Sequence, residues 1–526
     1  MTRALIIATG RTAGGPDPGP SAALRCGDGR EAPTLLTRLC RRLATLNVPD
    51  LHVITRPDLA PLLRKDGHDV VECATVADDL REIARLARTA AEAGADGADG
   101  RGGPIMLLPG DLVASDELLC RLLMDAKGPA TALTVPRPGG GGAYGVAPVR
   151  LDGDRIASAG SPFHRVTGAG AGSPGALRVA RRHAGALADL ADRLAALLET
   201  PGALAGPNAF AGAGADAGGG EAAEAAELLL VGLVRTGVPV TACPAGRLVC
   251  VRAGGRRAVR VALEAAEAVD EDRVRLEAAV KRDDGFFATF AVSPFSPYLA
   301  RWAAWWGLTP NTVSAISLGF AVLAAVWFSD GTRAGMVAGA LLLYVSFVLD
   351  CVDGQLARYT RTFSALGAWL DAVLDRVKEA AVYAGLAVGA GAAAPGSPVH
   401  AGNVWGLAVA ALALLAVRHL VGYAFAARRR PPAAGPPEPF PLTARPDGAL
   451  AGRLPSAEEL SRQTSRVAAL HWAKKIIVLP MGERLALIAV TAAVADARLT
   501  FTALIAWGSV AAAYTLAGRV MRSAAR

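Results

Sequence analysis

The chain has 526 residues, enough for two or more domains, and 52% of them are hydrophobic, which favours a protein with a membrane-embedded part. Its seven cysteines are odd in number and contain no CxxC pair, which argues against a disulfide or zinc framework and for a reducing compartment. The formal net charge of +8 fits anionic lipid better than nucleic acid, because arginines flank the hydrophobic runs and the sequence contains no nucleic-acid-binding motif.

The first half of the chain alternates short apolar runs with segments of helical spacing. Strands are expected at residues 4–9, 51–55, 105–108, 228–233 and 248–252. Helices are expected at residues 34–46, 77–91 and 262–280. This alternation predicts a layered α/β domain. Because the chain opens on Met1-Thr-Arg and a strand-like run, no signal peptide is expected and this half should stay in the cytoplasm.

Two loops after these strands carry residues typical of a nucleotide site. The glycine-rich loop Gly10–Gly15 follows the first strand, and Asp111 follows the strand at 105–108. This order resembles the nucleotidyltransferases, whose first loop holds the nucleotide phosphates and whose matching aspartate holds a metal ion. The resemblance implies a Rossmann-like fold with a site at Gly10 and Asp111. The loop lacks the usual arginine–leucine ending and no Pro-Lys pair follows, so a degenerate domain stays open as an alternative.

The segment between the two halves is rich in aromatic residues. Between residues 286 and 306 it holds eight aromatic side chains, and basic residues lie at Lys281, Arg282 and Arg301. Aromatic and basic side chains together are typical of the bilayer interface, so an amphipathic helix on the membrane surface is expected here.

Apolar stretches of membrane-spanning length dominate the rest of the chain. They lie at residues 311–328, 334–357, 365–390, 402–426, 474–495 and 498–518. Pro310 favours a helix start at the first of them. The second half is therefore expected to be an all-α polytopic membrane domain of about six transmembrane helices.

The distribution of basic residues predicts an orientation in the cell membrane. The segment between the fourth and fifth stretches carries Arg428, Arg429, Arg430, Arg445, Arg453, Arg462, Arg466, Lys474 and Lys475. The connection at 391–402 has no lysine or arginine. The positive-inside rule then places both termini and the Pro-rich loop 431–460 in the cytoplasm. That loop is expected to be poorly ordered.

Four carboxylates interrupt the second and third apolar stretches. Asp350 and Asp353 are spaced i,i+3, and Asp371 and Asp375 are spaced i,i+4, so each pair shares one helix face. Each unpaired carboxylate deep in a bilayer costs about 2.5–3.5 kcal/mol, so a compensating cation or a water-filled cavity is expected. Converging carboxylate oxygens suit hard divalent ions, Mg²⁺ or Mn²⁺.

The spacing around these acids is specific. It reads Asp-x₂-Asp-Gly-x₂-Ala-Arg-x₈-Gly-x₃-Asp-x₃-Asp from Asp350 to Asp375. This pattern resembles the complete signature of the CDP-alcohol phosphotransferases (CDP-alcohol phosphatidyltransferases), and the resemblance extends over about residues 281–526. It implies release of CMP, two Mg²⁺ or Mn²⁺ ions and a homodimer. It also implies metal ligation by Asp350, Asp353, Asp371 and Asp375, with Asp375 as general base. The nucleotide would be bound at Gly354, Ala357, Arg358 and Gly367.

The sequence gives less information about the acceptor than about the metal ligands. Arg361, Arg376 and Lys378 could hold an anionic acceptor such as an inositol phosphate or a glycerol phosphate, or could be interfacial cations. A phospholipid synthase using CDP-diacylglycerol is the simpler interpretation. The fusion also resembles the bifunctional inositol-phosphate cytidylyltransferase and di-inositol-phosphate phosphate synthases. A metal-dependent transporter is an alternative of another class, and a catalytically inactive scaffold is a further one.

These inferences divide the chain into three parts. Residues 1–265 are expected to form the cytoplasmic α/β domain, 266–310 a linker with the interfacial helix, and 311–526 the membrane domain.

Overall fold

The computed structural model describes the chain except residues 1, 13–18, 30, 93–102, 127, 137–143, 165, 201–222, 282–283, 394–402, 429–467 and 525–526. The predicted Pro-rich loop 431–460 and the arginines between 429 and 466 lie outside the described residues. The chain forms two compact units, one running to Val274 and the other starting at Arg275. The domain boundaries predicted at residues 265 and 310 remain predictions, because they divide the chain by function and not by compactness alone.

The first unit is built around a mixed sheet of ten strands. Its strands are β1 (Arg3–Ile7), β2 (Asp50–Thr55), β3 (Val70–Glu72), β4 (Ile105–Pro109), β6 (Ala130–Pro136), β7 (Ala147–Asp152), β8 (Arg155–Ala159), β9 (Ala171–Ser173), β10 (Leu177–Val179) and β11 (Val240–Pro244). Their order is β11-β8-β7-β9-β6-β10-β4-β1-β2-β3, and β11 also pairs with β6. The neighbours of β1, which are β2 and β4, run parallel to it.

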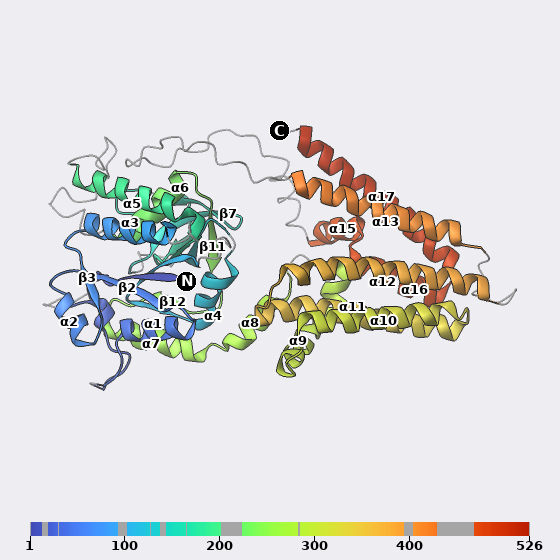
Figure 1. Ribbon diagram of the computed structural model, residues 1–526, viewed down its shortest axis with the longest axis horizontal. Coiled ribbons are helices and arrows are strands. Elements are labelled where there is room, and N and C mark those ends of the chain that lie inside the picture. Colours follow the sequence, from blue (N-terminus) through green and yellow to red (C-terminus); the bar gives the residue numbers. More distant parts are fainter. Residues whose placement is uncertain are drawn as a thin grey trace. The chain divides into compact units, whose positions relative to one another are not determined.

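Helices cover both faces of this sheet (Figure 1). The helices are α1 (Leu35–Thr45), α2 (Ala60–Lys65), α3 (Val76–Glu92), α4 (Asp116–Cys120), α5 (Ala184–Glu199), α6 (Ala225–Arg235) and α7 (Arg256–Ala268). The next helix, α8 (Glu271–Ala279), begins in the first unit and ends in the second. Leu5 and Ile7 of β1 pack in one core with α3, α5 and α6, and Ala4 and Ile6 pack in a second core with α1, α2 and α4. Successive residues of a strand point to opposite faces, so a strand covered on both faces is apolar throughout.

Most of the expected elements of this unit are confirmed, but one has the wrong type and another is divided in two. Residues 228–233 were expected to be a strand but belong to α6, whose Leu-rich run is buried on nearly every side. An apolar run that is buried all round carries no clear periodicity, so its pattern does not distinguish a helix from a buried strand. The expected single helix at 262–280 is two helices, α7 and α8, with a break at Val269–Asp270.

A small two-stranded sheet lies beside the large one and bears on the site described below. It consists of β5 (Leu112–Ala114) and β12 (Cys250–Arg252), which pair antiparallel with Arg252 opposite Leu112. Asp111 immediately precedes β5. The carboxyl ends of the parallel strands β1 and β4 meet at one edge of the large sheet, which brings the loop after β1 and Asp111 after β4 together.

The second unit is helical. Its helices are α9 (Ser296–Trp305), α10 (Pro310–Ser329), α11 (Arg333–Thr360), α12 (Ala365–Ala392), α13 (Trp405–Arg428), α15 (Ala468–Val478), α16 (Met481–Val494) and α17 (Ala497–Ala524). α10 begins as predicted, because Thr309 accepts a hydrogen bond from the Thr312 amide and Pro310 occupies the first turn. Each of the six predicted apolar stretches contains helix, but the stretch at 474–495 is broken at residues 479–480 into α15 and α16, and α13 begins only at Trp405.

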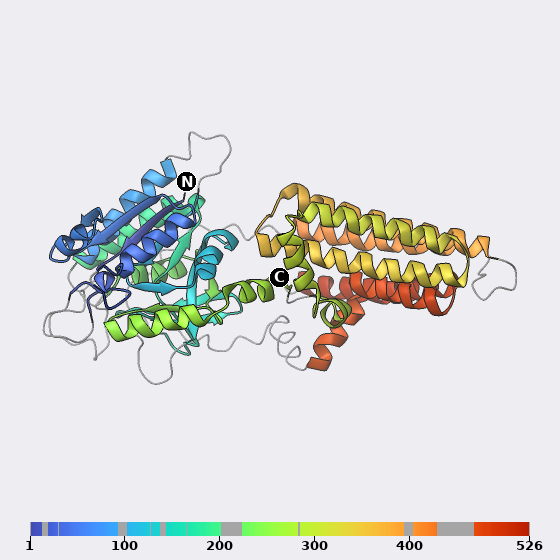
Figure 2. The same ribbon diagram turned by 90° about the horizontal axis from the view of Figure 1, so that it is seen from below.

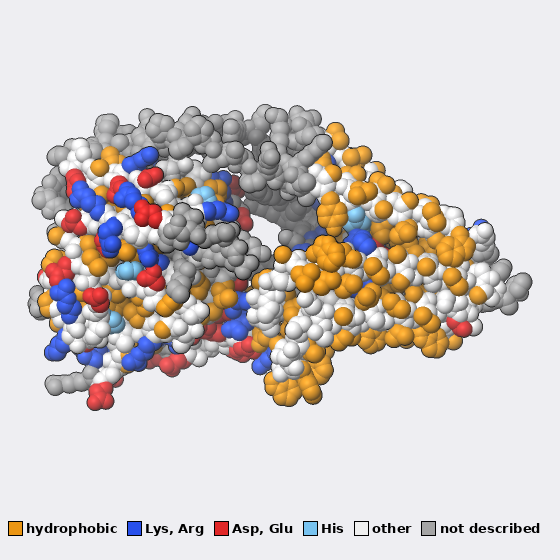
Figure 3. Space-filling view, viewed as in Figure 1, with side chains coloured by type: hydrophobic (Ala, Val, Ile, Leu, Met, Phe, Trp, Pro, Cys, Tyr) orange, Lys and Arg blue, Asp and Glu red, His pale blue; other side chains and the backbone are white. Residues whose placement is uncertain are grey.

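Length and hydropathy support a membrane protein. Among the described residues, α10, α11, α13 and α17 are long and apolar enough to cross a membrane, and the bent pair α15–α16 makes a fifth span if counted as one. The remaining predicted span, at residues 365–390, corresponds to α12, which carries five charged side chains: Asp371, Asp375, Arg376, Lys378 and Glu379. Hydrophobic side chains dominate the visible surface of the second unit, whereas Lys, Arg, Asp and Glu are scattered over the first (Figure 3).

Helices α10, α11 and α12 pack closely and form the frame of the site (Figure 2). Ser317 of α10 donates to the Ser346 carbonyl of α11 at 2.8 Å, and Ser346 donates back to the Ser317 carbonyl at 2.8 Å. Gly389 of α12 approaches α10 so closely that a Cβ there would lie 1.9 Å from the Phe328 carbonyl oxygen. Small residues allow such close helix approach in membranes.

The expected interfacial segment precedes α10. It begins with a π-helical turn at Ala288–Val292 and continues as α9. Tyr298, Trp305 and Trp306 are exposed, Trp305 by 80%, while Ala300 and Ala303 on the other face are buried. Exposed aromatics on one face and small buried residues on the other agree with the expected amphipathic helix.

Candidate active site

The four signature aspartates come together from the last turns of α11 and the first turns of α12. Carboxylate oxygens of Asp350, Asp353 and Asp371 all lie within 4.8 Å of one another. Asp353 is buried and Asp371 is exposed, so the cluster reaches from the helix interface to the surface of the unit. Three converging carboxylates, one of them accessible, fit a divalent cation with oxygen ligands. The residues present are therefore compatible with the metal that the signature implies.

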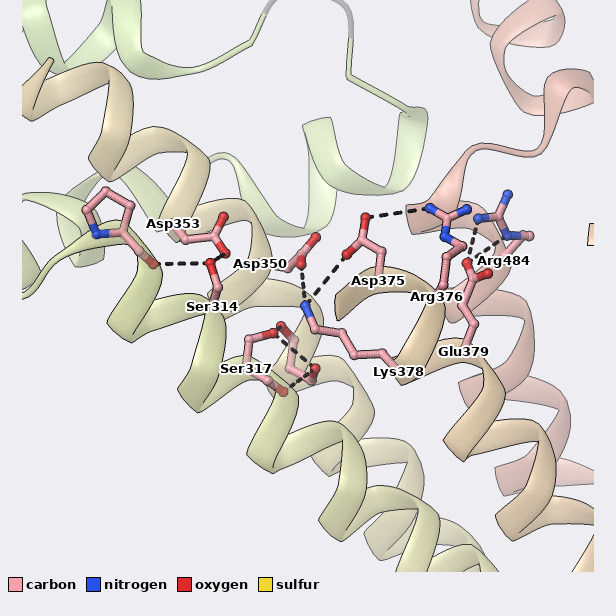
Figure 4. Close-up of polar contacts among 11 residues, drawn as sticks. Ser314, Ser317, Asp350, Asp353, Asp375, Arg376, Lys378, Glu379 and Arg484 are labelled. Carbon is pink, nitrogen blue, oxygen red and sulfur yellow. Dashed lines mark hydrogen bonds and ion pairs between the residues drawn. The ribbon is translucent and has the colours of Figure 1, made fainter. Parts of the chain in front are cut away.

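A hydroxyl on α10 orients the buried aspartate. Ser314 Oγ donates to Asp353 Oδ2 at 2.5 Å, and it also lies 3.1 Å from the carbonyl oxygen of Pro310, one turn earlier in α10 (Figure 4). The sequence analysis did not identify Ser314. A serine in an otherwise apolar run is a weak signal, because serine also satisfies itself within a helix, and here only the packing of α10 on α11 brings it to the acid.

Lys378 connects two of the aspartates. Its Nζ lies 2.5 Å from Asp350 Oδ1 and 3.7 Å from Asp375 Oδ1, and its side chain is 3% exposed. Asp375 Oδ1 is buried and accepts no hydrogen bond among the described residues. The lysine therefore neutralises part of the cluster's charge, while one oxygen of Asp375 retains a free lone pair.

The small residues of the signature have different surroundings. A Cβ added to Gly354 would meet only Arg358, at 3.5 Å or more, so the face of α11 beside Asp353 is bare. Gly367 is tightly held in the first turn of α12, where a Cβ would lie 2.8 Å from Ser364 Oγ. Arg358 donates through Nε to the Ala279 carbonyl. Ala357 is partly exposed on the same helix.

The three predicted acceptor residues have different surroundings. Lys378 is engaged by Asp350 and Asp375, as described above. Arg376 contacts His419 Nε2 of α13, and its Nη2 lies 3.7 Å from Asp375 Oδ2. Arg361 ends α11 in a left-handed conformation with φ of 57°, so it belongs to the turn that joins the two signature helices.

Charged residues on α13 and α16 extend this polar region, and the sequence analysis did not identify them. Arg484 Nη2 donates to Glu379 Oε1 at 2.5 Å, and both side chains are buried (Figure 4). Arg418 donates to the Val478 carbonyl at 2.7 Å, and Arg484 donates to the Leu479 carbonyl at 3.3 Å. Ionisable residues inside membrane spans are rare and usually functional, so their presence in two apolar runs was an available signal.

The predicted site of the first unit differs from the aspartate cluster of the second, because its carboxylate is paired with an arginine. Asp111 is buried, and both its oxygens are bonded: Arg252 Nε donates to Oδ1 at 2.7 Å and Arg252 Nη2 to Oδ2 at 3.0 Å. Ser21 Oγ and Tyr144 Oη also approach Oδ2, at 2.8 and 3.2 Å. Burial, and next the nearby Asp111 carboxylate, raise the pKa of Tyr144 to about 12. Gly10 lies against the same carboxylate, so the structure does bring the two predicted residues together.

Comparison with known proteins assigns the family of the second unit. Residues 307–444 match the family model described as CDP-alcohol phosphatidyltransferase. The second unit contains a CDP-alcohol phosphatidyltransferase domain. The matched region begins just before α10 and includes all four signature aspartates of α11 and α12.

Relatives of this CDP-alcohol phosphatidyltransferase domain include two curated proteins. A bifunctional IPC transferase and DIPP synthase of Rubrobacter xylanophilus is 40% identical over 98 residues, which are 18% of this chain and 22% of the relative. An archaetidylinositol phosphate synthase of Pyrococcus horikoshii is 34% identical over 83 residues, 16% of this chain and 43% of the relative. The chain thus spans less than half of the length of either relative.

A solved structure is similar to the other part of the chain. The inositol-1-phosphate CTP transferase from T. maritima aligns with a TM-score of 0.31 and 14% identity, covering 51% of this chain and 97% of that one.

Proposed function

We propose that this protein is an integral-membrane CDP-alcohol phosphotransferase. It would transfer a substituted phosphate from a CDP-alcohol to an acceptor hydroxyl and release CMP, as a step in phospholipid biosynthesis. The observation that supports this most strongly is the convergence of the signature aspartates from α11 and α12 within the region that matches the family model. The names of the relatives favour an inositol phosphate as the acceptor.

In this proposal Asp350, Asp353 and Asp371 hold the divalent cation, Mg²⁺ or Mn²⁺. When bound, the cation supplies positive charge to the pyrophosphate of the donor. Ser314 keeps the Asp353 carboxylate oriented through its 2.5 Å hydrogen bond. The expected number of two ions, and a share of Asp375 in holding them, are part of the proposal.

Asp375 would act as the general base. Its Oδ1 has a free lone pair, and it can accept the proton of the acceptor hydroxyl. The acceptor oxygen then forms a bond to the phosphorus that bears the alcohol, and the bond from that phosphorus to the oxygen of the CMP phosphate breaks. The bare face of α11 at Gly354 and Ala357, together with Gly367, would leave space for the cytidine nucleotide. Arg358 would offer charge to it.

The arginines of α12, α13 and α16 would attract an anionic acceptor. Arg376, Arg418 and Arg484 lie on these helices, with His419 and the buried acid Glu379 among them. The guanidinium group binds phosphate oxygens in a fork geometry, so arginines suit an acceptor that carries its own phosphate. Arg361 would contribute from the turn between α11 and α12.

The remaining features of the proposal concern assembly and location. Following the positive-inside rule, both termini and the site face the cytoplasm of a multi-pass protein. Residues 1–265 would form the cytoplasmic domain, 266–310 the interfacial linker and 311–526 the membrane domain, and the chain would work as a homodimer in contact with membrane lipid.

CMP release by the detergent-purified chain tests this function. CDP-diacylglycerol and CDP-inositol would each be offered with Mg²⁺ and with inositol 1-phosphate or glycerol 3-phosphate as acceptor. We expect CMP from at least one pair, lost on chelation, and a fall of about 10²–10⁴-fold in Asp375→Asn. Asp330→Asn, an acid at the opposite end of α10, is the matched control and should keep wild-type turnover. No CMP from folded protein would instead support the transporter or scaffold interpretation.

A further inference from the structure

The carboxylate of Asp111 in the first unit has a protein cation as its counter-ion. Arg252 presents its guanidinium to Asp111 as a two-pronged fork, with Nε and Nη2 each donating to one oxygen. This bidentate arrangement is the strongest pairing that an arginine makes with a carboxylate. Since Ser21 and Tyr144 also approach Oδ2, Asp111 is fully bonded without any metal ion.

Arg252 is held in place by its own surroundings. Its Nη1 donates to Glu224 Oε2 at 2.5 Å, and the guanidinium lies over the ring of Tyr144 at 5.5 Å from the centroid. Its backbone is fixed by the pairing of β12 with β5, and the Ala253 amide donates to the Asp111 carbonyl at 3.1 Å. The burial of both side chains, 2% exposed for Arg252 and 1% for Asp111, keeps the pair away from water.

Gly10, which follows β1, lies against the same carboxylate, whereas residues 13–15 of the predicted glycine-rich loop lie outside the described residues. A Cβ added to Gly10 would lie 2.7 Å from Ser21 Oγ, 3.0 Å from Asp111 Oδ2 and 3.2 Å from Tyr144 Oη. Gly10 therefore packs on the carboxylate itself. A divalent cation needs several oxygen ligands at about 2.0–2.6 Å, and the atoms around Asp111 fill that space with donors instead. The residues present do not fit the metal that the nucleotidyltransferase resemblance implies.

The lysines of the first unit give a second reason to conclude that its residues do not fit a nucleotidyltransferase site. Its lysines are Lys65 and Lys127, and Lys65 lies in the last turn of α2. The Pro-Lys pair that the resemblance would require is not in the sequence. The positive charge beside Asp111 is thus supplied by an arginine that the fold holds in place.

We infer that the first unit does not transfer nucleotides through a metal ion at Asp111, because Arg252 takes the place of that ion as the counter-charge of the carboxylate. Building on the proposed function, the CDP-alcohol consumed by the membrane domain then has to come from a separate reaction. That reaction is of the cytidylyltransferase class. A phosphate oxygen of a phosphorylated alcohol attacks the α-phosphorus of CTP, and the bond from that phosphorus to the oxygen of the leaving pyrophosphate breaks.

Two assays on the full-length protein separate this inference from the proposed function. In the first, CTP and Mg²⁺ are offered with inositol 1-phosphate or glycerol 3-phosphate, and pyrophosphate release is measured. In the second, preformed CDP-alcohols are offered and CMP release is measured. We expect no pyrophosphate in the first assay and CMP in the second. Pyrophosphate release that disappears in Asp111→Asn would overturn the inference, whereas absence of CMP in the second assay would count against the proposed function alone.

Direct metal binding gives a readout that does not depend on the choice of substrate. In a full-length variant carrying Asp350→Asn, Asp353→Asn, Asp371→Asn and Asp375→Asn, the second unit has lost all four carboxylates that the proposed function assigns to the metal. Titration of this variant with Mn²⁺, followed by electron paramagnetic resonance, should give the spectrum of the free ion. A bound Mn²⁺ signal that is lost when Asp111→Asn is added, in a variant whose circular dichroism is unchanged, would contradict the inference.

Discussion

Lys378 is the residue of the membrane site whose surroundings depart most from a simple metal cluster. Its ammonium group lies 2.5 Å from an oxygen of Asp350 and occupies space that a cation bound to Asp350 would share. Two like charges a few ångströms apart repel by several kcal/mol even at an effective dielectric constant of about 20. The lysine and the metal ion therefore compete for the same carboxylate.

Replacing this lysine should tighten metal binding. We expect Lys378→Gln to lower the dissociation constant for Mn²⁺ by at least about tenfold, because the competing charge is removed while the carboxylates stay in place. Isothermal titration calorimetry of the purified variant measures this directly. Lys475→Gln is the matched control, since Lys475 binds the Asp284 carbonyl outside the aspartate cluster. Unchanged or weaker Mn²⁺ binding in Lys378→Gln would mean that the lysine orients Asp350 more than it competes.

Glu227 makes the stability of the first unit depend on pH. Burial, and next the neighbouring Glu224, raise the pKa of Glu227 from 4.5 to about 7. A carboxyl group whose pKa is higher in the folded state binds more protons when folded. The free energy of unfolding therefore falls as the pH rises from about 4.5 to about 7, and the loss is complete above that range.

The variant Glu227→Gln should remove this dependence. Between pH 5 and 7.5 we expect the wild type to lose about 1–2 kcal/mol more stability than the variant, allowing for the part of the side chain that water reaches. Urea unfolding of residues 1–274, followed by circular dichroism, is the measurement, because all eight tryptophans lie at or after Trp302 and report only on the second unit. If the free energy of unfolding changes with pH to the same extent in the two proteins, the prediction that the pKa of Glu227 is raised is wrong.

At the scale of elements, the bend between α15 and α16 organises the charged region beside the aspartates. The two helices meet at 72°, and Leu479 between them has a φ of 49°, a left-handed conformation that side chains other than glycine rarely adopt. Arg418 and Arg484 bond the carbonyls of Val478 and Leu479 that the end of α15 leaves without partners. Both arginines thus hold the bend, and Arg484 at the same time pairs with Glu379 of α12.

Breaking the pair between α12 and α16 should destabilise the membrane unit. Arg484→Met leaves Glu379 buried without its cation, which we expect to cost about 3–5 kcal/mol. The double variant Glu379→Leu/Arg484→Met should recover part of this loss, since it no longer buries an unpaired charge. Tryptophan fluorescence during thermal unfolding in detergent reports on both. A double variant that melts no higher than Arg484→Met would indicate that the bonds of Arg484 to the bend matter more than the ion pair.

At the scale of the whole molecule, the chain consists of two units with different chemistry. The first is an α/β unit whose candidate site is closed by an arginine, and the second is a helical membrane unit whose candidate site is open at Asp371. If the first unit does not make the CDP-alcohol donor, the second unit should catalyse the proposed transfer in the absence of the first unit.

Separation of the units tests this division. We expect residues 275–526 to retain CMP release from a preformed CDP-alcohol within about a few fold of the full chain, because every residue assigned to the reaction lies in the second unit. Residues 1–274 should be soluble without detergent. A membrane fragment that folds but loses turnover would show that the first unit contributes to the reaction, for example through the acceptor.

The amino-acid sequence by itself determined the general class of both units and the position of the candidate site in the second. Buried parallel strands and membrane spans produce long apolar patterns, and the four aspartates of the signature stand out because acids are costly in apolar helices. The helical state of residues 228–233 was not predictable, because a run buried on all sides has no informative period. Only the tertiary structure showed that Ser314, Lys378 and Arg484 meet the acidic residues of neighbouring helices.

The pairing of Asp111 with Arg252 shows most clearly what the tertiary structure decides and the sequence alone does not. The sequence placed the aspartate at the end of a strand, where a metal ligand was expected. Arg252 lies 141 positions further along the chain and reaches Asp111 because β12 pairs with β5. Contacts between residues so distant in sequence depend on how the strands assemble, so a local pattern predicts the residue but not the group that neutralises its charge.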